Sequence, residues 1–333
     1  MFRISLIGAG AISGCHAKTI QERNKEIELV SIADINEEAA RKIAPEGVKI
    51  YTDYQELLRK TTPDAVVIAL PHNLHKEVTI KALKFGAHVY VEKPMAISVA
   101  ECDEMIAAAE KYRKVLFVGH TQRYFPENIT AHNMIRTGKI GNLIWAKDLD
   151  IGYYGWEERM PWHLDPKQGG GGLLPNRGVH QIDRLQFFFD SQVEKVLGRA
   201  ETFWPGSKVD GNVGAMLIFR NGRYAFLMGS GYICAPQYVT ELFGIKGAIK
   251  TIGGLSLEAS FDNKPYIHYP YEGGPGGEVS FYNGFRNIYN SFFEAIQGKK
   301  AATDAYYGRQ IMAVVEAIYK STQTGKEIKV KQS

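Results

Sequence analysis

Cysteine is scarce in this sequence, with three among 333 residues. Cys15, Cys102 and Cys234 stand far apart and lack the paired spacing of a metal site or a disulfide framework. We therefore expect a reducing compartment and no metal centre. Cys15 follows a glycine turn, so either a helix N-terminus lowers the pKa of its thiol or the side chain simply packs inside the helix.

Concentrated positive charge and long apolar runs are also missing. The formal net charge is only +4, and no cluster of lysine and arginine forms a basic patch, which argues against nucleic acid as a partner. No stretch approaches the roughly 20 apolar residues of a membrane span. The apolar run at residues 2–7 is too short for a signal peptide. We expect a soluble, cytoplasmic protein that binds no membrane.

The chain is long for a single core, and its character changes near Gln122. Before that point short apolar runs alternate with helical patterns, which indicates an α/β domain with a parallel sheet at residues 1–121. After it, alternating strands follow one another without helices between them. This pattern predicts an α+β domain with an open, mainly antiparallel sheet at residues 122–333.

A glycine turn follows the first apolar run. Gly8 suits a tight turn, Gly10 lets a backbone approach a pyrophosphate closely, and a helix opening near Ala11 directs its N–H groups at those phosphates. Ser13 replaces the usual third glycine but is small. The spacing predicts a dinucleotide site.

A second apolar run, residues 27–33, ends at Asp34, at the distance expected for the acid that binds an adenosine ribose. Its carboxylate would repel a 2′-phosphate, and Ile35 and Asn36 supply no cation to attract one. We therefore expect NAD rather than NADP. The alternative is that Asp34 merely caps the following helix.

The later strands of this domain deliver further candidates at their carboxyl ends, where ligands bind in open α/β sheets. The run at residues 65–69 leads to Pro71, and His75 then opens a helix, either as a cofactor contact or as a capping or packing residue. The run at residues 88–91 leads to Glu92-Lys93-Pro94, where Lys93 points at the cofactor or is an ordinary surface charge.

The second domain carries an unusual segment at residues 153–189. Four glycines at residues 169–172 predict a close-approach point facing the cleft. Asn176, His180 and Asp183 then recur at i, i+4 and i+7, so on a helix they share one face. His180 is either a catalytic group or a buried histidine with satisfied bonds.

The ordered set of Gly8-x-Gly10, Asp34, Glu92-Lys93-Pro94 and Gly178-x-His180-x-x-Asp183 resembles the Gfo/Idh/MocA family of nicotinamide-dependent oxidoreductases. The resemblance covers nearly the whole chain and implies an N-terminal Rossmann domain. It also implies Lys93 beside the nicotinamide and a cis Lys93–Pro94 bond. The implied cofactor contacts are Gly8, Gly10, Ala11, Ile12, Ser13, Asp34, Pro71 and Glu92.

The resemblance further implies that His180 transfers a proton. The family often has Asp four residues before this histidine, whereas this chain has Asn176, which can orient a hydroxyl or the imidazole but supplies no negative charge. We expect Asn176 to position the substrate.

The expected activity is hydride transfer between NAD and a secondary alcohol of a sugar, inositol or related polyol. Tyr153 and Trp162, with their neighbours Tyr154 and Trp156, either stack on a sugar or line a subunit interface, and Gln122 and Arg123 would bind hydroxyls. An NAD-dependent, redox-assisted glycosidase and a non-catalytic NAD-binding regulator are the alternatives.

Self-association is a further expectation. An antiparallel sheet usually leaves one face without helices, and we place Tyr232, Tyr238 and Phe243 on that face. A homodimer or homotetramer follows.

Overall fold

The computed structural model describes residues 1–23, 25–274 and 277–332. Contacts divide the chain into two compact units. The first consists of Met1–Gly119 with Phe285–Arg309, and the second of His120–Gly284 with Gln310–Ser333. None of the described helices has an apolar stretch long enough to cross a bilayer.

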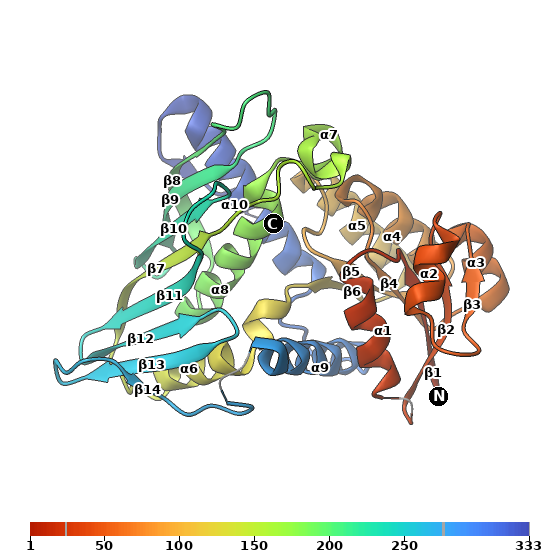
Figure 1. The fold of residues 1–333 in the computed structure, drawn as a ribbon, viewed down its shortest axis with the longest axis horizontal. Coiled ribbons are helices and arrows are strands. Elements are labelled where there is room, and N and C mark those ends of the chain that lie inside the picture. The colour runs from red at the N-terminus through yellow and green to blue at the C-terminus, as the bar shows by residue number, and fades with distance from the viewer. Residues whose placement is uncertain (24, 275–276, 333) are drawn as a thin grey trace. The chain divides into compact units, whose positions relative to one another are not determined.

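The first unit contains a six-stranded parallel sheet in the order β3-β2-β1-β4-β5-β6 (Figure 1). Its strands are β1 (Phe2–Ile7), β2 (Ile27–Ala33), β3 (Lys49–Tyr51), β4 (Ala65–Ile68), β5 (His88–Glu92) and β6 (Leu116–Gly119). Its helices are α1 (Ser13–Gln21), α2 (Glu37–Ile43), α3 (Tyr54–Thr61), α4 (His75–Lys84) and α5 (Val99–Tyr112). The strand order reverses between β1 and β4, and this is where such sheets bind dinucleotides.

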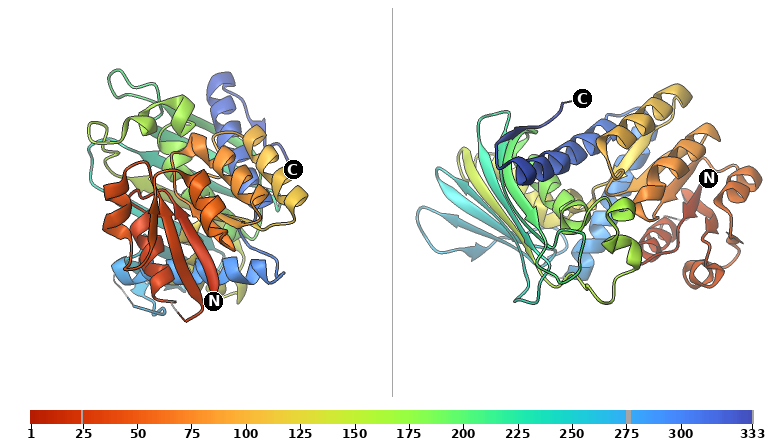
Figure 2. Two further views of the ribbon diagram at one scale, coloured as in Figure 1. Left: turned by 90° about the vertical axis from the view of Figure 1, so that its right-hand side faces the viewer. Right: turned by 90° about the horizontal axis from the view of Figure 1, so that it is seen from above.

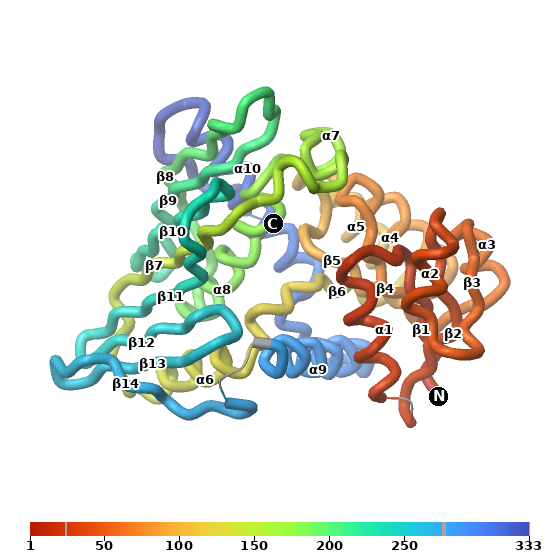
Figure 3. The backbone as a smooth tube through the Cα atoms, in the orientation of Figure 1, coloured from red at the N-terminus to blue at the C-terminus, as the bar shows by residue number. Residues whose placement is uncertain are grey.

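A late segment of the chain completes the first unit. Helix α9 (Gly277–Ile296) begins in the second unit, and its part from Phe285 onward packs in the first, where Phe293 meets Phe2 edge to face at 5.4 Å between ring centroids. Val118 then donates its backbone N–H to the Thr303 carbonyl at 2.9 Å. Figure 3 lets the reader follow this segment along the backbone.

The second unit is built on a nine-stranded sheet in the order β14-β13-β12-β11-β7-β10-β9-β8-β15. All of its pairs are antiparallel except β7 with β10. The strands are β7 (Leu143–Ile151), β8 (Val193–Glu201), β9 (Asn212–Phe219), β10 (Tyr224–Ser230), β11 (Gln237–Gly244), β12 (Gly247–Ile252), β13 (Ser256–Phe261), β14 (Ile267–His268) and β15 (Ile328–Lys329). The predicted fold class is confirmed in both sheets.

Helices α6 (Pro126–Arg136), η4 (Leu174–Gly178) and α8 (Val179–Phe189), with the later part of α10 (Ala305–Thr324), pack on one face of this sheet (Figure 2). The unit also contains the short helices η2 (Thr121–Tyr124), η3 (Pro161–Leu164) and α7 (Pro166–Gly169). The other face of the sheet is not covered by these helices. Residues of β10 therefore alternate in burial, and Tyr224, Phe226 and Met228 are exposed between buried neighbours. Trp145 and Phe243 stack at 4.3 Å on that open face.

Two of the three aromatic residues predicted for the open face lie elsewhere. Only Phe243 is there. Tyr238 shares the helix-covered face with Thr240, whose hydroxyl binds Asp148 under α8, because residues two apart on a strand point the same way. Tyr232 follows β10 and stacks on Trp156 at 5.9 Å.

Candidate active site

The turn after β1 requires glycine. Gly8 has φ +102°, and a Cβ atom there would lie 2.1 Å from the Ala69 carbonyl oxygen at the end of β4. Its N–H donates to the Ala33 carbonyl at 2.8 Å, which ties the turn to β2. The predicted tight turn is therefore present at the topological switch of the sheet.

The start of α1 leaves room for a phosphate group. Nothing lies within 4 Å of the position a Gly10 Cβ would take. The hydroxyl of Ser13, at the first residue of α1, is buried and has no hydrogen-bond partner among the described residues. Together with the N–H groups that an α-helix leaves unpaired at its start, these features fit a pyrophosphate. Burial raises the pKa of the nearby Cys15 thiol, which goes against the alternative that the helix N-terminus lowers it.

Asp34 lies directly after β2 and faces this turn. Its carboxylate accepts hydrogen bonds from the Ala9 N–H at 2.6 Å and the Asn36 N–H at 2.8 Å. The cap of α2 is Asn36, whose side chain accepts from the Ala39 N–H at 3.1 Å. The alternative that Asp34 caps this helix is wrong, and its position fits the ribose contact.

His75 has a structural task. Its ring nitrogens lie 2.9 Å from the carbonyl oxygens of Leu70 and Pro94, so the imidazole joins the loop after β4 to the loop after β5. Burial lowers the pKa of this histidine, although the two backbone contacts oppose that effect. Pro71 lies between the bridged segments.

Lys93 stands at the carboxyl end of β5, half-buried, and the Lys93–Pro94 peptide bond is cis as predicted. The preceding Glu92 is buried, and its Oε2 accepts the Lys93 backbone N–H at 3.2 Å. Burial by itself raises the pKa of Glu92. The hydrogen bond from His16 and the charges of His16 and Lys93 outweigh it, so the pKa of Glu92 is lowered.

His16 is a residue that the sequence reasoning missed. Its Nε2 lies 3.0 Å from Glu92 Oε1 and its Nδ1 lies 2.9 Å from the Tyr289 hydroxyl, and the side chain is completely buried. A buried carboxylate requires such a partner. The only signal in the sequence is a histidine one turn into the helix that follows the glycine turn.

Asn176 and His180 lie in the second unit on successive helical pieces. Asn176 belongs to η4, a π-helical turn, and His180 to the first turn of α8; both are half-buried. A π turn contains more residues than an α turn, so the i, i+4 spacing does not place the two side chains in α-helical register.

The glycine run makes its close approach to the protein itself. A Cβ on Gly172 would lie 2.0 Å from the Asp210 carbonyl oxygen, and one on Gly171 would lie 2.0 Å from the Tyr319 hydroxyl. Asp210 accepts the N–H groups of Gly172 and Leu174, each at 2.8 Å. The predicted close approach is therefore present at Gly171 and Gly172, where it is made to other parts of the protein and fixes the start of the η4–α8 segment.

The third member of the polar stripe, Asp183, forms a buried ion pair with Arg123. Arg123 Nη2 lies 2.6 Å from Asp183 Oδ1, and the guanidinium also lies over the Phe187 ring at 5.2 Å. This pair explains why an otherwise apolar helix carries an acid at that position.

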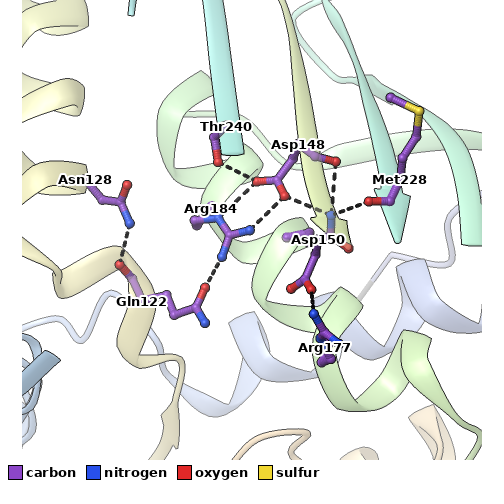
Figure 4. Close-up of polar contacts among 9 residues, drawn as sticks. Gln122, Asn128, Asp148, Asp150, Arg177, Arg184, Met228 and Thr240 are labelled. Atoms are coloured by element: carbon purple, nitrogen blue, oxygen red, sulfur yellow. Dashed lines mark hydrogen bonds and ion pairs between the residues drawn. The ribbon is translucent and has the colours of Figure 1, made fainter. Parts of the chain in front are cut away.

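A second buried network surrounds Asp148 on β7 (Figure 4). Arg184 donates to both carboxylate oxygens, at 3.0 and 2.7 Å. Gln181 and Thr240 add bonds of 2.8 and 2.7 Å, and Arg184 also donates to the side-chain oxygen of Gln122. Two residues further along β7, Asp150 pairs with Arg177. Sequence reasoning anticipated Gln122 but not the charges around it.

The predicted sugar-stacking aromatics fall into two groups. Tyr154 and Trp156 are buried, and Trp156 stacks on Trp204 at 5.5 Å, so neither presents a face to a ligand and that prediction is wrong for them. Tyr153 is exposed and donates to Glu157 at 3.0 Å. Trp162 is half-buried and stacks on His163 at 3.5 Å.

Comparison with known proteins connects these features. Residues 2–120 match the sequence profile "Oxidoreductase family, NAD-binding Rossmann fold", and residues 129–250 match the "GFO/IDH/MocA C-terminal domain". An uncharacterized oxidoreductase of Streptococcus pneumoniae is 30% identical over 259 residues, which cover 75% of this chain and 68% of that protein.

Two further proteins are similar to this chain. A 2,7-anhydro-N-acetylneuraminate hydratase of Mediterraneibacter gnavus is 29% identical over 74% of this chain and 66% of its own length. The structure of levoglucosan dehydrogenase with NADH and levoglucosan superimposes with a TM-score of 0.88 at 22% identity, covering 99% of this chain and 100% of that one. This chain therefore belongs to the Gfo/Idh/MocA family of NAD(P)-dependent oxidoreductases.

Proposed function

We propose that this protein oxidises a secondary alcohol of a sugar, inositol or related cyclic polyol and transfers the hydride to NAD. The observation that carries the proposal is the position of Lys93. It follows β5 at the edge of the sheet that holds the dinucleotide turn, and its backbone is fixed by the buried Glu92. Ligands bind beyond the carboxyl ends of the strands in open sheets of this kind, which supports a cofactor-site role for this ammonium group.

His180, Lys93 and Asn176 have separate roles in the proposed hydride transfer. Bound nicotinamide supplies the hydride acceptor. His180 removes the hydroxyl proton, a task that suits an imidazole because its pKa lies near neutrality. Lys93 donates a hydrogen bond to the same oxygen and stabilises its developing negative charge. Asn176 orients the substrate.

Asp34 supports NAD over NADP. Its carboxylate at the end of β2 would accept hydrogen bonds from the ribose hydroxyls and repel a 2′-phosphate. The neighbouring Ile35 is 93% exposed and has no charge that could attract such a phosphate. The turn residues Gly8, Gly10, Ala11, Ile12 and Ser13 hold the pyrophosphate, with Pro71 and Glu92 as the remaining cofactor contacts.

The substrate class depends on the second unit. Tyr153 and Trp162 are the candidates for faces against sugar C–H groups, and Gln122 and Arg123 for contacts to hydroxyls. The relative with bound levoglucosan supports a cyclic sugar. The sheet face that carries Trp145, Phe226 and Phe243 supports a homodimer or homotetramer.

A screen of sugars and inositols for NADH formation at 340 nm tests the activity. We expect at least one cyclic polyol to reduce NAD and none to reduce NADP faster. Binding of NADH without turnover of any substrate would favour a regulator.

A redox-neutral reaction is the second candidate, because one relative is named a hydratase. A redox-assisted glycosidase oxidises a sugar carbon only transiently and needs NAD in catalytic amounts. Conversion of an anhydrosugar or glycoside with catalytic NAD and no accumulation of NADH distinguishes it from a dehydrogenase.

A further inference from the structure

The second unit contains a cavity of about 580 Å³ between two of its loops, which we call the α7 cavity. One wall is the segment at residues 164–167, and the other is the turn at residues 204–208 between β8 and β9; the two lie side by side in Figure 1. Pockets for small-molecule ligands usually measure ~300–1,000 Å³, so this cavity is large enough for a sugar. Its lining differs from the residues assigned above to the cofactor, the substrate and catalysis.

The turn between β8 and β9 has a defined shape. Pro205 and Gly206 occupy its centre, where Gly206 has φ +74°, a conformation that glycine adopts readily. The Ser207 N–H donates to the Trp204 carbonyl at 3.1 Å and closes the turn. Trp204 and Lys208 therefore flank a closed turn, and both line the cavity.

The aromatic surface of the cavity comes from Trp204, which is half-buried. The buried Trp156 stacks on it with 5.5 Å between ring centroids and an interplanar angle of 10°. Trp156 is itself held by the hydrogen bond from its indole N–H to the Gly231 carbonyl at 3.0 Å. An indole ring supported in this way offers a flat apolar surface to the C–H groups of a sugar ring.

Positive charge exceeds negative charge in the lining. Lys167 and Lys208 are exposed, one on each wall, and Asp165 is the acid between them along the lining. Asp165 accepts the Gln168 side-chain amide at 2.8 Å and the Lys167 backbone N–H at 2.9 Å. These hydrogen bonds, with the charges of Lys167 and Lys208, lower the pKa of Asp165. Asp165 is therefore ionised at neutral pH, and two lysines against one aspartate leave one positive charge in surplus.

The two ammonium groups are available to a ligand. Within the described chain, no carboxylate oxygen lies at ion-pair distance from Lys167 or Lys208, although both act on Asp165 at longer range. The cavity therefore combines cationic donors on both walls with an aromatic surface and one carboxylate acceptor. This combination suits a ligand with an anionic group, a ring and hydroxyl donors.

We propose that the α7 cavity binds a sugar acid, a pyranose ring that carries one carboxylate. The carboxylate binds Lys167 and Lys208, and the C–H face of the ring lies on Trp204. Ring hydroxyls donate to Asp165. One carboxylate matches the single surplus positive charge, whereas a doubly charged phosphate would exceed it. The site goes beyond the proposed hydride transfer and does not depend on it.

Calorimetric titration of the whole protein with D-glucuronate, D-glucose and cyclohexanecarboxylate tests the site. D-Glucose has the ring and hydroxyls without the charge, and cyclohexanecarboxylate has the charge without the hydroxyls. We expect D-glucuronate to bind about tenfold more tightly than either. Its Kd should rise about fivefold in Lys208→Gln and about tenfold in Trp204→Leu. Lys264→Gln and Phe203→Leu, at exposed positions outside the lining, are the matched controls and should bind as wild type.

The variants also separate this cavity from the proposed substrate site. Weaker D-glucuronate binding with unchanged NADH affinity supports the α7 cavity. Lys208 is exposed, so Lys208→Gln tests the site even where loss of the Trp204 ring disturbs folding. A D-glucuronate Kd within twofold of wild type in Lys208→Gln overturns the proposal, as does absence of D-glucuronate binding by wild type. Equal affinity for D-glucose or cyclohexanecarboxylate also overturns it, because the charge or the hydroxyls would then play no part.

Discussion

The buried ionisable side chains beside Lys93 are stabilised by contacts with one another, because they have little access to solvent. Glu92 is held by His16, and His16 in turn contacts Tyr289, so three polar groups occupy the core without an unpaired charge. Removing one member of such a pair typically costs ~3–5 kcal/mol. The local order around Lys93 therefore depends on a residue 77 positions earlier in the chain, which no local pattern in the sequence could indicate.

In the proposed mechanism, residue 176 is the position from which a carboxylate could act on the base His180. Because Asn supplies no negative charge, Asn176→Asp should stabilise protonated His180 and move the acidic limb of the kcat/KM profile to higher pH. The profile of the variant is compared with that of wild type between pH 5 and 9. An unchanged profile would show that residue 176 does not act on His180.

His75 makes folding stability depend on pH. Its pKa is lowered in the folded state, so the unfolded chain binds a proton first as pH falls below the ordinary value of ~6.5. We expect the free energy of unfolding to fall between pH 7 and 5.5. His75→Gln should reduce that slope without abolishing it, because burial also lowers the pKa of His88.

Urea titrations at several pH values measure this slope. The exposed His268→Gln is the control and should follow wild type at every pH. Equal slopes in wild type and His75→Gln would contradict the assignment.

The elements of the first unit were largely predictable. Continuous β-branched runs such as that of β4 can only be buried strands, and Gly86 marks the end of α4 as expected. The elements of the second unit were less predictable from the sequence. The short β14 and β15 lack an alternating pattern of useful length, and the π turn η4 has the same composition as an α-helical start.

The candidate site shows the same division. The glycine turn, Asp34 and Lys93 follow from spacing along the chain, whereas the contacts of Arg123, Gln122 and His16 depend on tertiary packing. The glycine run was recognised as a close-approach point, but only the structure identifies Asp210 and Tyr319 as the groups approached. A glycine in the sequence shows that a side chain is absent at that position. It does not show which other groups of the protein fill the space.

The glycine run sets the position of α8. Gly172→Ala would drive a Cβ into the Asp210 backbone, so we expect destabilisation of ~1–3 kcal/mol or more and impaired activity. Gly214→Ala on β9 is the matched control, since nothing lies within 4 Å of its Cβ position. The urea concentration at the unfolding midpoint is measured for both variants. Similar midpoints would contradict the packing role of Gly172.

At the scale of the whole molecule, the open sheet face predicts self-association. Phe226 and Met228 are exposed beside the stacked Trp145 and Phe243. We expect light scattering after size exclusion to give a dimer or tetramer for wild type, and Phe226→Lys with Met228→Lys to dissociate it because burial of two ammonium groups is costly. Met160→Lys, exposed outside the sheet, should leave the assembly intact. A monomeric wild type at micromolar concentration would refute this use of the face.

The central claim assigns one reaction to a lysine from the first unit and a histidine from the second. The direct test is NADH formation from the best substrate of the screen by Lys93→Ala and His180→Asn, with NADH affinity measured by fluorescence in the same samples. We predict that Lys93→Ala abolishes turnover and that His180→Asn lowers it by ~10²–10⁴-fold, while NADH still binds. Turnover close to wild type in either variant would contradict the account.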